Sequence, residues 1–270
     1  MTGGRRRVLR VEQGGASRWV VDDLTAEEPL EIQLDGASLS VTMRTPGDDF
    51  DLAVGFLITE GIVRSAGEIA TLRMCPRAGA GSGPLNIVQV SLRHPPGAAA
   101  APRSFFMTSS CGICGKASID QVRTRTAYPV GADPLVVSPA LLASLPSRLR
   151  DAQRQFSRTG GLHAAGLFDR DGNAVCVRED VGRHNAFDKV IGWAATAGRL
   201  PLTSHLIVAS GRASFELTQK ALMAGIPLLA AVSAPSDLAV DLAEEAGMTL
   251  VGFLRGEGMN VYAGHRRVHP

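Results

Sequence analysis

The sequence predicts an α/β protein, α+β overall, with a β-rich N-terminal domain over residues 1–134 and an α/β domain over residues 135–270. Two observations predict this division. Short extended runs separated by turn residues fill the first part of the chain, whereas strands and helices alternate from about residue 135 onward. Because this alternation is typical of crossovers between parallel strands, we expect a parallel or mixed sheet in the second domain.

The N-terminal domain is predicted from extended runs and one amphipathic segment. An Asp-Gly turn at residues 35–36 joins two of the runs into a hairpin. Apolar spacing, acidic residues at the start and a glycine at the end predict a helix within residues 48–61. Low-complexity loops are expected at 76–84 and 95–102. The predicted strands are 18–21, 30–34, 38–43 and one around 86–92.

The α/β domain is predicted from a regular succession of apolar strands and amphipathic helices. Its first two strands meet at the turn Asp171–Gly172, and its last three strands are separated by helices in a βαβαβ order. In chain order the predicted elements are a helix over 141–156, strands over 164–169 and 174–178, a helix over 185–197, a strand over 205–209, a helix over 215–224, a strand over 226–232, a helix over 238–246 and a strand over 249–254.

Composition excludes several classes of protein. With 45% apolar and 20% charged residues, the chain is expected to fold rather than stay disordered. The net charge of +2 gives no uniform field for nucleic acid, and Arg5–Arg7 is interpreted as a solvated tail. Four cysteines are too few for a secreted disulfide framework, and no run approaches the roughly 18 apolar residues of a membrane span. We therefore expect a cytoplasmic protein with reduced thiols that binds neither nucleic acid nor a membrane.

Two of the cysteines, Cys111 and Cys114, lie in a glycine-rich loop over residues 109–116 with the motif CGxCG. An extended run over 104–107 precedes this loop, and a helix is predicted over 118–123. Backbone amides, the helix dipole and a nearby lysine all favour the thiolate form of cysteine in such a position. A thiolate is both a nucleophile and a metal ligand, so the loop is the first place in the sequence to look for chemistry.

Four interpretations of this loop stay open from the residues alone. The thiols are small buried residues, or they belong to a structural zinc site, although Cys75 and Cys176 are isolated and supply no second ligand pair. A strand followed by CxxC and a helix is also typical of thiol-disulfide oxidoreductases. The fourth interpretation is a sulfur carrier, in which a thiolate accepts a sulfane sulfur as a persulfide and passes it on. Glycines on both sides of the thiols favour this last interpretation, because it needs a loop that moves.

Polar segments recur where strands of the α/β domain end. Residues 178–189 combine acids, arginines, a histidine and an asparagine, and residues 159–165 hold a histidine after two glycines. The turns at 210–214 and 233–237 place small residues before helices, whose amides can face an anion, and 252–260 holds three glycines and an arginine. Each segment also fits simple capping or a tight hairpin. Together they predict a phosphate-bearing ligand along the carboxyl edge of the sheet.

Six motifs carry a resemblance to a known family. In chain order they are DLAVGFLITEGI (51–62), SCGICG (110–115), TGGLHA (159–164), EDVGRHN (179–185), SGR (210–212) and GFLRG (252–256). In this order the motifs resemble the FdhD family of formate dehydrogenase accessory sulfurtransferases, and the resemblance covers nearly the whole chain. It implies a cytoplasmic homodimer that receives sulfur from a cysteine desulfurase. The acceptor would be the molybdenum of the bis(molybdopterin guanine dinucleotide) cofactor, Mo-bisMGD, which formate dehydrogenase needs in sulfurated form.

The resemblance does not fix which thiol carries the persulfide, so that role is assigned by analogy and by chemistry. Cys111 is expected to carry the persulfide as the catalytic residue, because it directly follows the strand and a serine pair, with Cys114 as an assisting or relay thiol. The α/β domain is expected to resemble the cytidine deaminase fold without its zinc chemistry, so no metal ligands are predicted. The segment that the resemblance assigns to cofactor binding is Phe253, Leu254, Arg255, Gly256, Glu257 and Gly258.

Overall fold

The computed structural model describes residues 3–76, 85–94, 105–106, 126–256 and 258–269. Three sheets and the helices around them make up the described part of the chain, so the predicted α/β class is confirmed. The CGxCG loop and the helix predicted at 118–123 lie outside the described residues, as does most of the two low-complexity loops. The cytidine deaminase resemblance and the domain boundary after residue 134 stay predictions.

The α/β half is built on a six-stranded mixed sheet in the order β13-β12-β11-β10-β8-β9. Strands β10, β11 and β12 are parallel, and β8 runs antiparallel between β10 and β9. The central strands are buried along their whole length, as expected for a sheet covered on both faces. The strands are β8 (His163–Phe168), β9 (Ala174–Asp180), β10 (Leu206–Ala209), β11 (Leu228–Ala231), β12 (Thr249–Arg255) and β13 (Gly258–Ala263).

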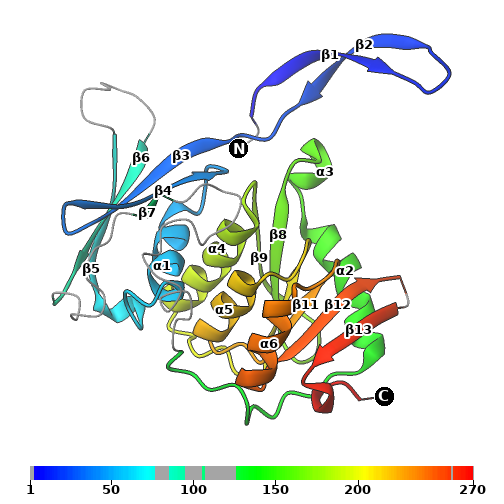
Figure 1. Cartoon of the computed structure of the whole chain (residues 1–270). Helices are drawn as coiled ribbons and strands as arrows, with labels where there is room; N and C mark the ends of the chain where they lie inside the picture. Colours follow the sequence, from blue (N-terminus) through cyan, green and yellow to red (C-terminus); the bar gives the residue numbers. More distant parts are fainter. Residues whose placement is uncertain (1–2, 77–84, 95–104, 107–125, 257, 270) are drawn as a thin grey trace.

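Helices cover both faces of this sheet. α2 packs on one face through Leu142, Leu145 and Leu149, and α4, α5 and α6 lie on the opposite face (Figure 1). The predicted single helix over 141–156 is instead two helices with a short connection between them. The helices are α2 (Pro139–Ala152), α3 (Phe156–Thr159), α4 (Arg183–Thr196), α5 (Phe215–Met223) and α6 (Asp237–Ala246), with a final 3-10 turn η4 (His265–Arg267).

The N-terminal half holds a five-stranded sheet in the order β5-β6-β3-β4-β7. The predicted hairpin is present between β3 and β4, whereas β5 was not predicted from the sequence. The strands are β3 (Glu28–Leu34), β4 (Ala37–Arg44), β5 (Ile69–Pro76), β6 (Leu85–Leu92) and β7 (Phe105–Phe106), with helix α1 (Asp49–Thr59) and the 3-10 turn η1 (Ala66–Glu68).

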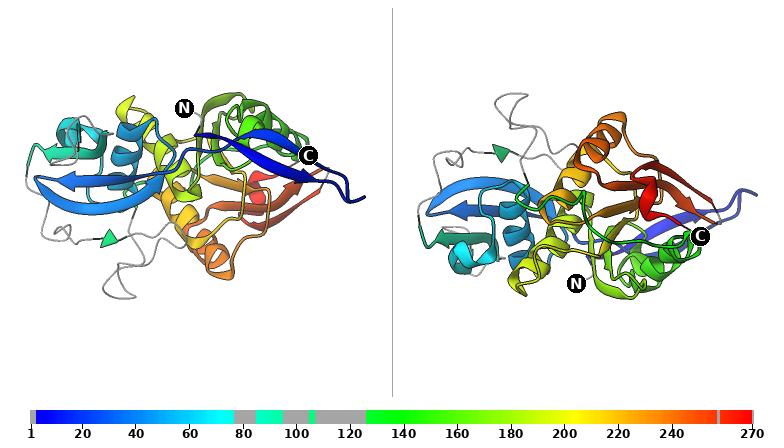
Figure 2. Two further views of the ribbon diagram at one scale, coloured as in Figure 1. Left: turned by 90° about the horizontal axis from the view of Figure 1, so that it is seen from above. Right: turned by 90° about the horizontal axis from the view of Figure 1, so that it is seen from below.

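A two-stranded ribbon, β1 (Arg5–Val11) and β2 (Ser17–Asp23), projects from the rest of the chain (Figure 1). Seen from above, it extends over the α/β half (Figure 2). The interpretation of Arg5–Arg7 as a solvated tail is confirmed for their exposure and wrong for the tail, because they belong to β1. These arginines are exposed, but they pair in register with β2, and Arg5 forms an ion pair with Asp23 at 3.2 Å.

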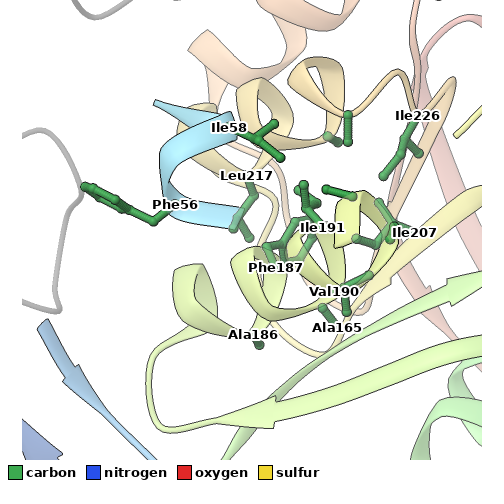
Figure 3. Close-up of a cluster of buried hydrophobic side chains, with 14 of the residues drawn as sticks. Phe56, Ile58, Ala165, Ala186, Phe187, Val190, Ile191, Ile207, Leu217 and Ile226 are labelled. Atoms are coloured by element: carbon green, nitrogen blue, oxygen red, sulfur yellow. The ribbon is translucent and has the colours of Figure 1, made fainter. Parts of the chain in front are cut away.

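The helix predicted in the N-terminal domain is present, and its main neighbour is α4 of the other half (Figure 1). One hydrophobic cluster contains side chains of both halves, among them Ile58 of α1, Phe187 of α4 and Ile207 of β10 (Figure 3). The core is therefore continuous across the predicted domain boundary. This packing holds the start of α4, and the polar residues there, in a fixed position relative to both sheets.

Candidate functional site

The carboxyl ends of β9, β10, β11 and β12 and the start of β8 share one edge of the sheet, as their parallel and antiparallel pairing requires. The turns that follow these strands are linked by backbone hydrogen bonds. The amide of Ser233 donates to the carbonyl of Gly211, and the amide of Phe253 donates to the carbonyl of Ser233, each at 3.2 Å. The structure thus brings the predicted turns 210–214, 233–237 and 252–260 side by side at the edge where α/β proteins bind ligands.

A pocket of about 460 Å³ opens at this edge. One side is formed by the sheet edge and the turns, and the other by α2, α3 and the connection between them. Its size falls in the usual range for small-molecule sites, about 300–1,000 Å³. The lining residues are Pro146, Leu149, Arg150, Gln153, Phe156, Gly160, Gly161, Leu162, His163, Val181, Ser210 and Val232.

His163, the histidine of the TGGLHA motif, lies in the wall of this pocket at the first position of β8. Burial lowers the pKa of His163, and the nearby positive charge of Arg183 lowers it further. The imidazole is therefore neutral at physiological pH, with one nitrogen able to donate and the other able to accept a hydrogen bond. Ser210 lies beside it, and its hydroxyl accepts a hydrogen bond from the amide of Ala164 at 2.8 Å.

A buried ion pair and several hydrogen bonds hold the EDVGRHN segment in place. Asp180 is fully buried, with one carboxylate oxygen 2.8 Å from the Lys189 ammonium and 3.1 Å from the amide of Thr45. Its other oxygen accepts from the amide of Gly182 and the side-chain amide of Asn185. Asp180 therefore ties the start of α4 to the N-terminal half, which agrees with a pairing role for the acid.

His184, from the same motif, lies in the first turn of α4 and is buried. Its Nε2 atom is 4.0 Å from a carboxylate oxygen of Glu216 in the first turn of α5. Burial lowers the pKa of His184 to about 3, with smaller contributions from Arg183, Lys220 and His163. Like His163, His184 is a neutral imidazole near the sheet edge.

The predicted cofactor segment forms the hairpin between β12 and β13, with Glu257 outside the described residues. Phe253 adopts a left-handed backbone conformation, with φ of 52°, which is unusual for a bulky residue and marks local strain. Arg255 is exposed and its guanidinium lies 5.6 Å from the centre of the Phe253 ring. Leu254 is fully buried in the core, so its side chain cannot contact a ligand there. None of the described residues of this segment lines the pocket, and their role in binding stays a prediction.

The structure describes two of the four cysteines, Cys75 and Cys176. Cys111 and Cys114 lie outside the described residues, so their assignment stays a prediction. Cys176 is buried on β9, and burial raises the pKa of its thiol to about 11. Cys75 is half-buried on β5, in the other sheet. Among the described residues, no group of three or more His, Cys, Asp or Glu side chains could hold a metal ion.

The sequence reasoning missed one wall of the pocket. Arg150, Gln153 and Phe156 come from the end of α2 and the start of α3, a region that was assigned only as a helix. A signal was present in the spacing: Leu142, Leu145 and Leu149 form a buried stripe on α2, and Gln153 continues it four residues later. Gln153 is the C-cap residue of α2, and a glutamine that continues an apolar stripe indicates a polar group that faces something other than the core.

Comparison with known proteins identifies the family of this chain. The model of the FdhD/NarQ family matches residues 25–269. The chain belongs to this family. The resemblance drawn from the sequence motifs is therefore confirmed.

Curated relatives support the same placement. A "Sulfur carrier protein FdhD" of Streptomyces avermitilis is 57% identical over 270 residues, covering 98% of this chain and 95% of the relative. A protein of the same name from Mycobacterium tuberculosis is 52% identical over 254 residues, covering 92% of both chains. A crystal structure described as a putative formate dehydrogenase accessory protein from Desulfotalea psychrophila matches all of both chains with a TM-score of 0.77. At 23% identity, that match supports the fold alone.

Within the described ranges, no helix is both long and apolar enough to cross a bilayer.

Proposed function

We propose that this protein is a sulfurtransferase that accepts a sulfane sulfur from a cysteine desulfurase on Cys111 and transfers it to Mo-bisMGD. The observation that carries the proposal is the combination of FdhD/NarQ membership, relatives named sulfur carrier proteins along nearly the whole chain, and two thiols in a CGxCG motif. Formate dehydrogenase is the enzyme that we expect to receive the sulfurated cofactor. The name of the Desulfotalea psychrophila neighbour indicates such a role for that protein.

Loading of the carrier is a thiol exchange reaction at sulfur. The Cys111 thiolate attacks the terminal sulfur of the donor's cysteine persulfide. A new S–S bond forms on Cys111 as the donor's S–S bond breaks, and the donor leaves as a thiolate. The sulfane sulfur moves without net oxidation or reduction, so loading needs no further reactant.

Delivery as sulfide needs two electrons, which the two thiols supply together as they are oxidised to a disulfide. The Cys114 thiolate attacks the Sγ atom of the Cys111 persulfide, forms a Cys111–Cys114 disulfide and releases hydrosulfide. A cellular thiol reductant then restores the two thiols. This division of labour gives Cys114 the assisting role and accounts for the close spacing of the two cysteines.

The acceptor is proposed to bind along the sheet edge, with Phe253–Gly258 as its cofactor segment. The exposed guanidinium of Arg255, the exposed Arg212 and the amides at the starts of α5 and α6 are groups that bind a diphosphate. Ser214 and Ser236 precede these helices, and neither makes a capping hydrogen bond through its side chain. The first backbone amides of α5 and α6 are therefore not occupied by these side chains, which supports a role in binding an anion.

A test of the acceptor assignment compares guanine and adenine nucleotides by calorimetry. GDP should bind more tightly than ADP, and Arg255→Ala or Arg212→Ala should weaken GDP binding by roughly 10- to 100-fold, the cost of losing a charged hydrogen bond. Equal affinity for the two nucleotides, or no loss in either variant, would mean that the acceptor lies elsewhere.

The protein is proposed to act in the cytoplasm as a homodimer. Persulfide chemistry needs reduced thiols, which the cytoplasm maintains. The ribbon exposes Leu9, Val11, Trp19 and Val21, at 49% to 63% of their surface, and such an apolar surface is typical of a contact with another chain. Light scattering at several concentrations measures the oligomeric state, and a monomer at all concentrations would contradict the proposal.

The cellular test uses a strain whose only copy of this protein is a variant. Cys111→Ala should abolish formate dehydrogenase activity while the protein still accumulates, and Cys75→Ala, a matched change on β5, should retain it. Full activity with Cys111→Ala would overturn the assignment of the carrier. Loss of activity only with Cys114→Ala would move the role to that residue.

A further inference from the structure

The ribbon formed by β1 and β2 presents an apolar face to solvent. In an antiparallel pair, residues opposite each other lie on the same face, and the register places Leu9 opposite Trp19 and Arg7 opposite Val21. Because side chains alternate along each strand, Leu9, Val11, Trp19 and Val21 share one face, and 49% to 63% of the surface of each is exposed. The guanidinium of Arg7, on the same face, lies 4.8 Å from the centre of the Trp19 ring. A contiguous apolar face of this kind indicates a contact surface.

The ribbon is held to the rest of its own chain at its base. A guanidinium nitrogen of Arg158 lies 3.7 Å from a carboxylate oxygen of Asp23, and the Thr25 hydroxyl donates to the hydroxyl of Thr159 at 2.8 Å. Beyond this base the two strands project away from the rest of the chain (Figure 1). A two-stranded ribbon without a packed face is only marginally stable in water. A second surface that covers the apolar face would therefore stabilise the ribbon.

Arginines surround this apolar face. The ribbon contains five exposed arginines, which are Arg5, Arg6, Arg7, Arg10 and Arg18. Arg5 is paired with Asp23, and the other four form no ion pair with any residue that the structure describes. Neighbouring strands lie only about 5 Å apart, so long side chains from either face of a two-stranded ribbon can reach a surface that covers it. That surface should therefore be apolar at its centre and acidic around it.

Helix α6 offers such a surface. Asp237, Asp241 and Glu244 recur at spacings of four and three residues, so they lie on one side of the helix, and all three are exposed. None of the three forms an ion pair with another described residue. Leu238 lies beside them with 43% of its surface exposed, and the helix contains no basic residue. α6 is therefore complementary to the ribbon in charge and matches its apolar centre.

We propose that two copies of this chain associate by placing the ribbon of each copy on α6 of the other. The inference rests on the proposed homodimer and names its interface. Within one chain the ribbon and α6 lie apart, so the ribbon does not cover its own α6 (Figure 1). A twofold axis makes the contact reciprocal, and it therefore occurs twice in the dimer. The FdhD/NarQ family model matches residues 25–269, so this interface uses a segment that the family model does not include.

Burial of apolar surface around Trp19 supplies most of the affinity of this contact, because exposed ion pairs add little free energy and mainly fix the orientation. Trp19→Ala should weaken the dimer at least about 30-fold in sedimentation equilibrium, the effect of removing a dominant interface side chain. Trp19 also reports the contact. The chain has two tryptophans, so Trp193→Phe leaves Trp19 as the single one. Its fluorescence should shift to the red on dilution to the monomer, because the indole becomes exposed to water.

Reversal of charge on both surfaces gives the sharper test. The ribbon variant combines Arg7→Glu with Arg10→Glu, and the helix variant combines Asp237→Arg with Asp241→Arg. Each variant alone should be monomeric, because like charges then face each other in both contacts. An equimolar mixture of the two variants should dimerise. In the mixed dimer one contact joins two altered surfaces and the other joins two unaltered ones, so both contacts again join opposite charges.

A matched control separates this effect from the change in total charge. Arg73→Glu with Arg170→Glu makes the same change of charge as the ribbon variant. Both residues are exposed and lie outside the ribbon and α6. This control should stay dimeric. Circular dichroism of every variant should match that of the wild type, which shows that the monomers are folded.

The outcomes separate this inference from the proposed function. If the wild type is dimeric and both variants stay dimeric, or if their mixture stays monomeric, the ribbon does not lie on α6 and the homodimer stands. If the wild type is a monomer at all concentrations, the interface and the homodimer both fail, while the carrier step at Cys111 stands. Ribbon variants that stay dimeric but lose formate dehydrogenase activity in the cell would assign the ribbon to another protein and would also overturn this proposal.

Discussion

Gly55 of α1 packs directly against the backbone of Asp188 on α4, so closely that a Cβ atom at Gly55 would lie 1.9 Å from the Asp188 carbonyl oxygen. The contact is reciprocal, because a Cβ at Gly192 of α4 would lie 1.8 Å from the carbonyl oxygen of Asp51. Two glycines thus let the helices approach backbone to backbone, and their approach joins the two halves of the chain.

Gly55→Ala should destabilise the protein, because the added methyl group forces α1 away from α4. Overpacking of a core typically costs about 1–3 kcal/mol, and a backbone neighbour cannot rotate out of the way. Urea denaturation should show a lower midpoint. Gly67→Ala is the control, since its nearest neighbour would be at 3.5 Å, and it should leave the midpoint within error. Equal midpoints for both variants would contradict the close approach.

Asp180→Asn should destabilise the fold more strongly. The change leaves the buried ammonium of Lys189 without its carboxylate, which lies 2.8 Å away, and breaking a buried ion pair from one side typically costs about 3–5 kcal/mol. Lys189→Met in the same chain should restore part of the loss, because it removes the unpaired charge. Chemical denaturation of the wild type, of Asp180→Asn, of Lys189→Met alone and of the double variant measures the coupling. A double variant no more stable than Asp180→Asn would argue against this contact.

Stability should fall in mild acid partly through His184. Its folded-state pKa is about 3, below the ordinary value of 6.5, so its contribution is complete above pH 6.5 and is lost as the pH falls toward 3. Between pH 6.5 and pH 5 the unfolded chain gains a proton at this position, which corresponds to roughly 2 kcal/mol. The pH dependence of unfolding should therefore be shallower by about that amount in His184→Gln. Parallel curves for the two proteins would mean that the pKa of His184 is not lowered in the folded state.

Much of the α/β half could be predicted from sequence, because its buried strands and amphipathic helices have clear periods. The ends of elements were less certain: the helix predicted to reach Phe156 stops at Ala152, and the polypeptide turns before α3. β1 was not predicted because its run of arginines lacks the alternation of apolar and polar residues that is typical of a strand. It forms by pairing with β2, where Arg5 meets Asp23, and not by burial.

Part of the candidate site, the set of turns at the sheet edge, could also be predicted from the sequence. Turns rich in glycine, serine and arginine mark the sheet edge in the sequence, and their spacing predicts that they meet there. The position of α1 on α4 depends on Gly55 and Gly192. A contact between two glycines far apart in sequence cannot be predicted from the sequence alone. The spacing of Gln153 after the leucine stripe of α2 indicates which face it lies on, but the pocket that it lines is visible only in the folded chain.

Sulfur loading of Cys111 is the most direct test of the carrier function. The purified protein would be incubated with a cysteine desulfurase and cysteine, and its intact mass and peptide masses measured before and after reduction. We expect a reducible increment of one sulfur atom on the peptide that contains Cys111, absent in Cys111→Ala. Cys176 should stay unmodified, because its thiol is buried and its pKa is about 11. No increment on the wild type, or an increment that persists in Cys111→Ala, would contradict the account.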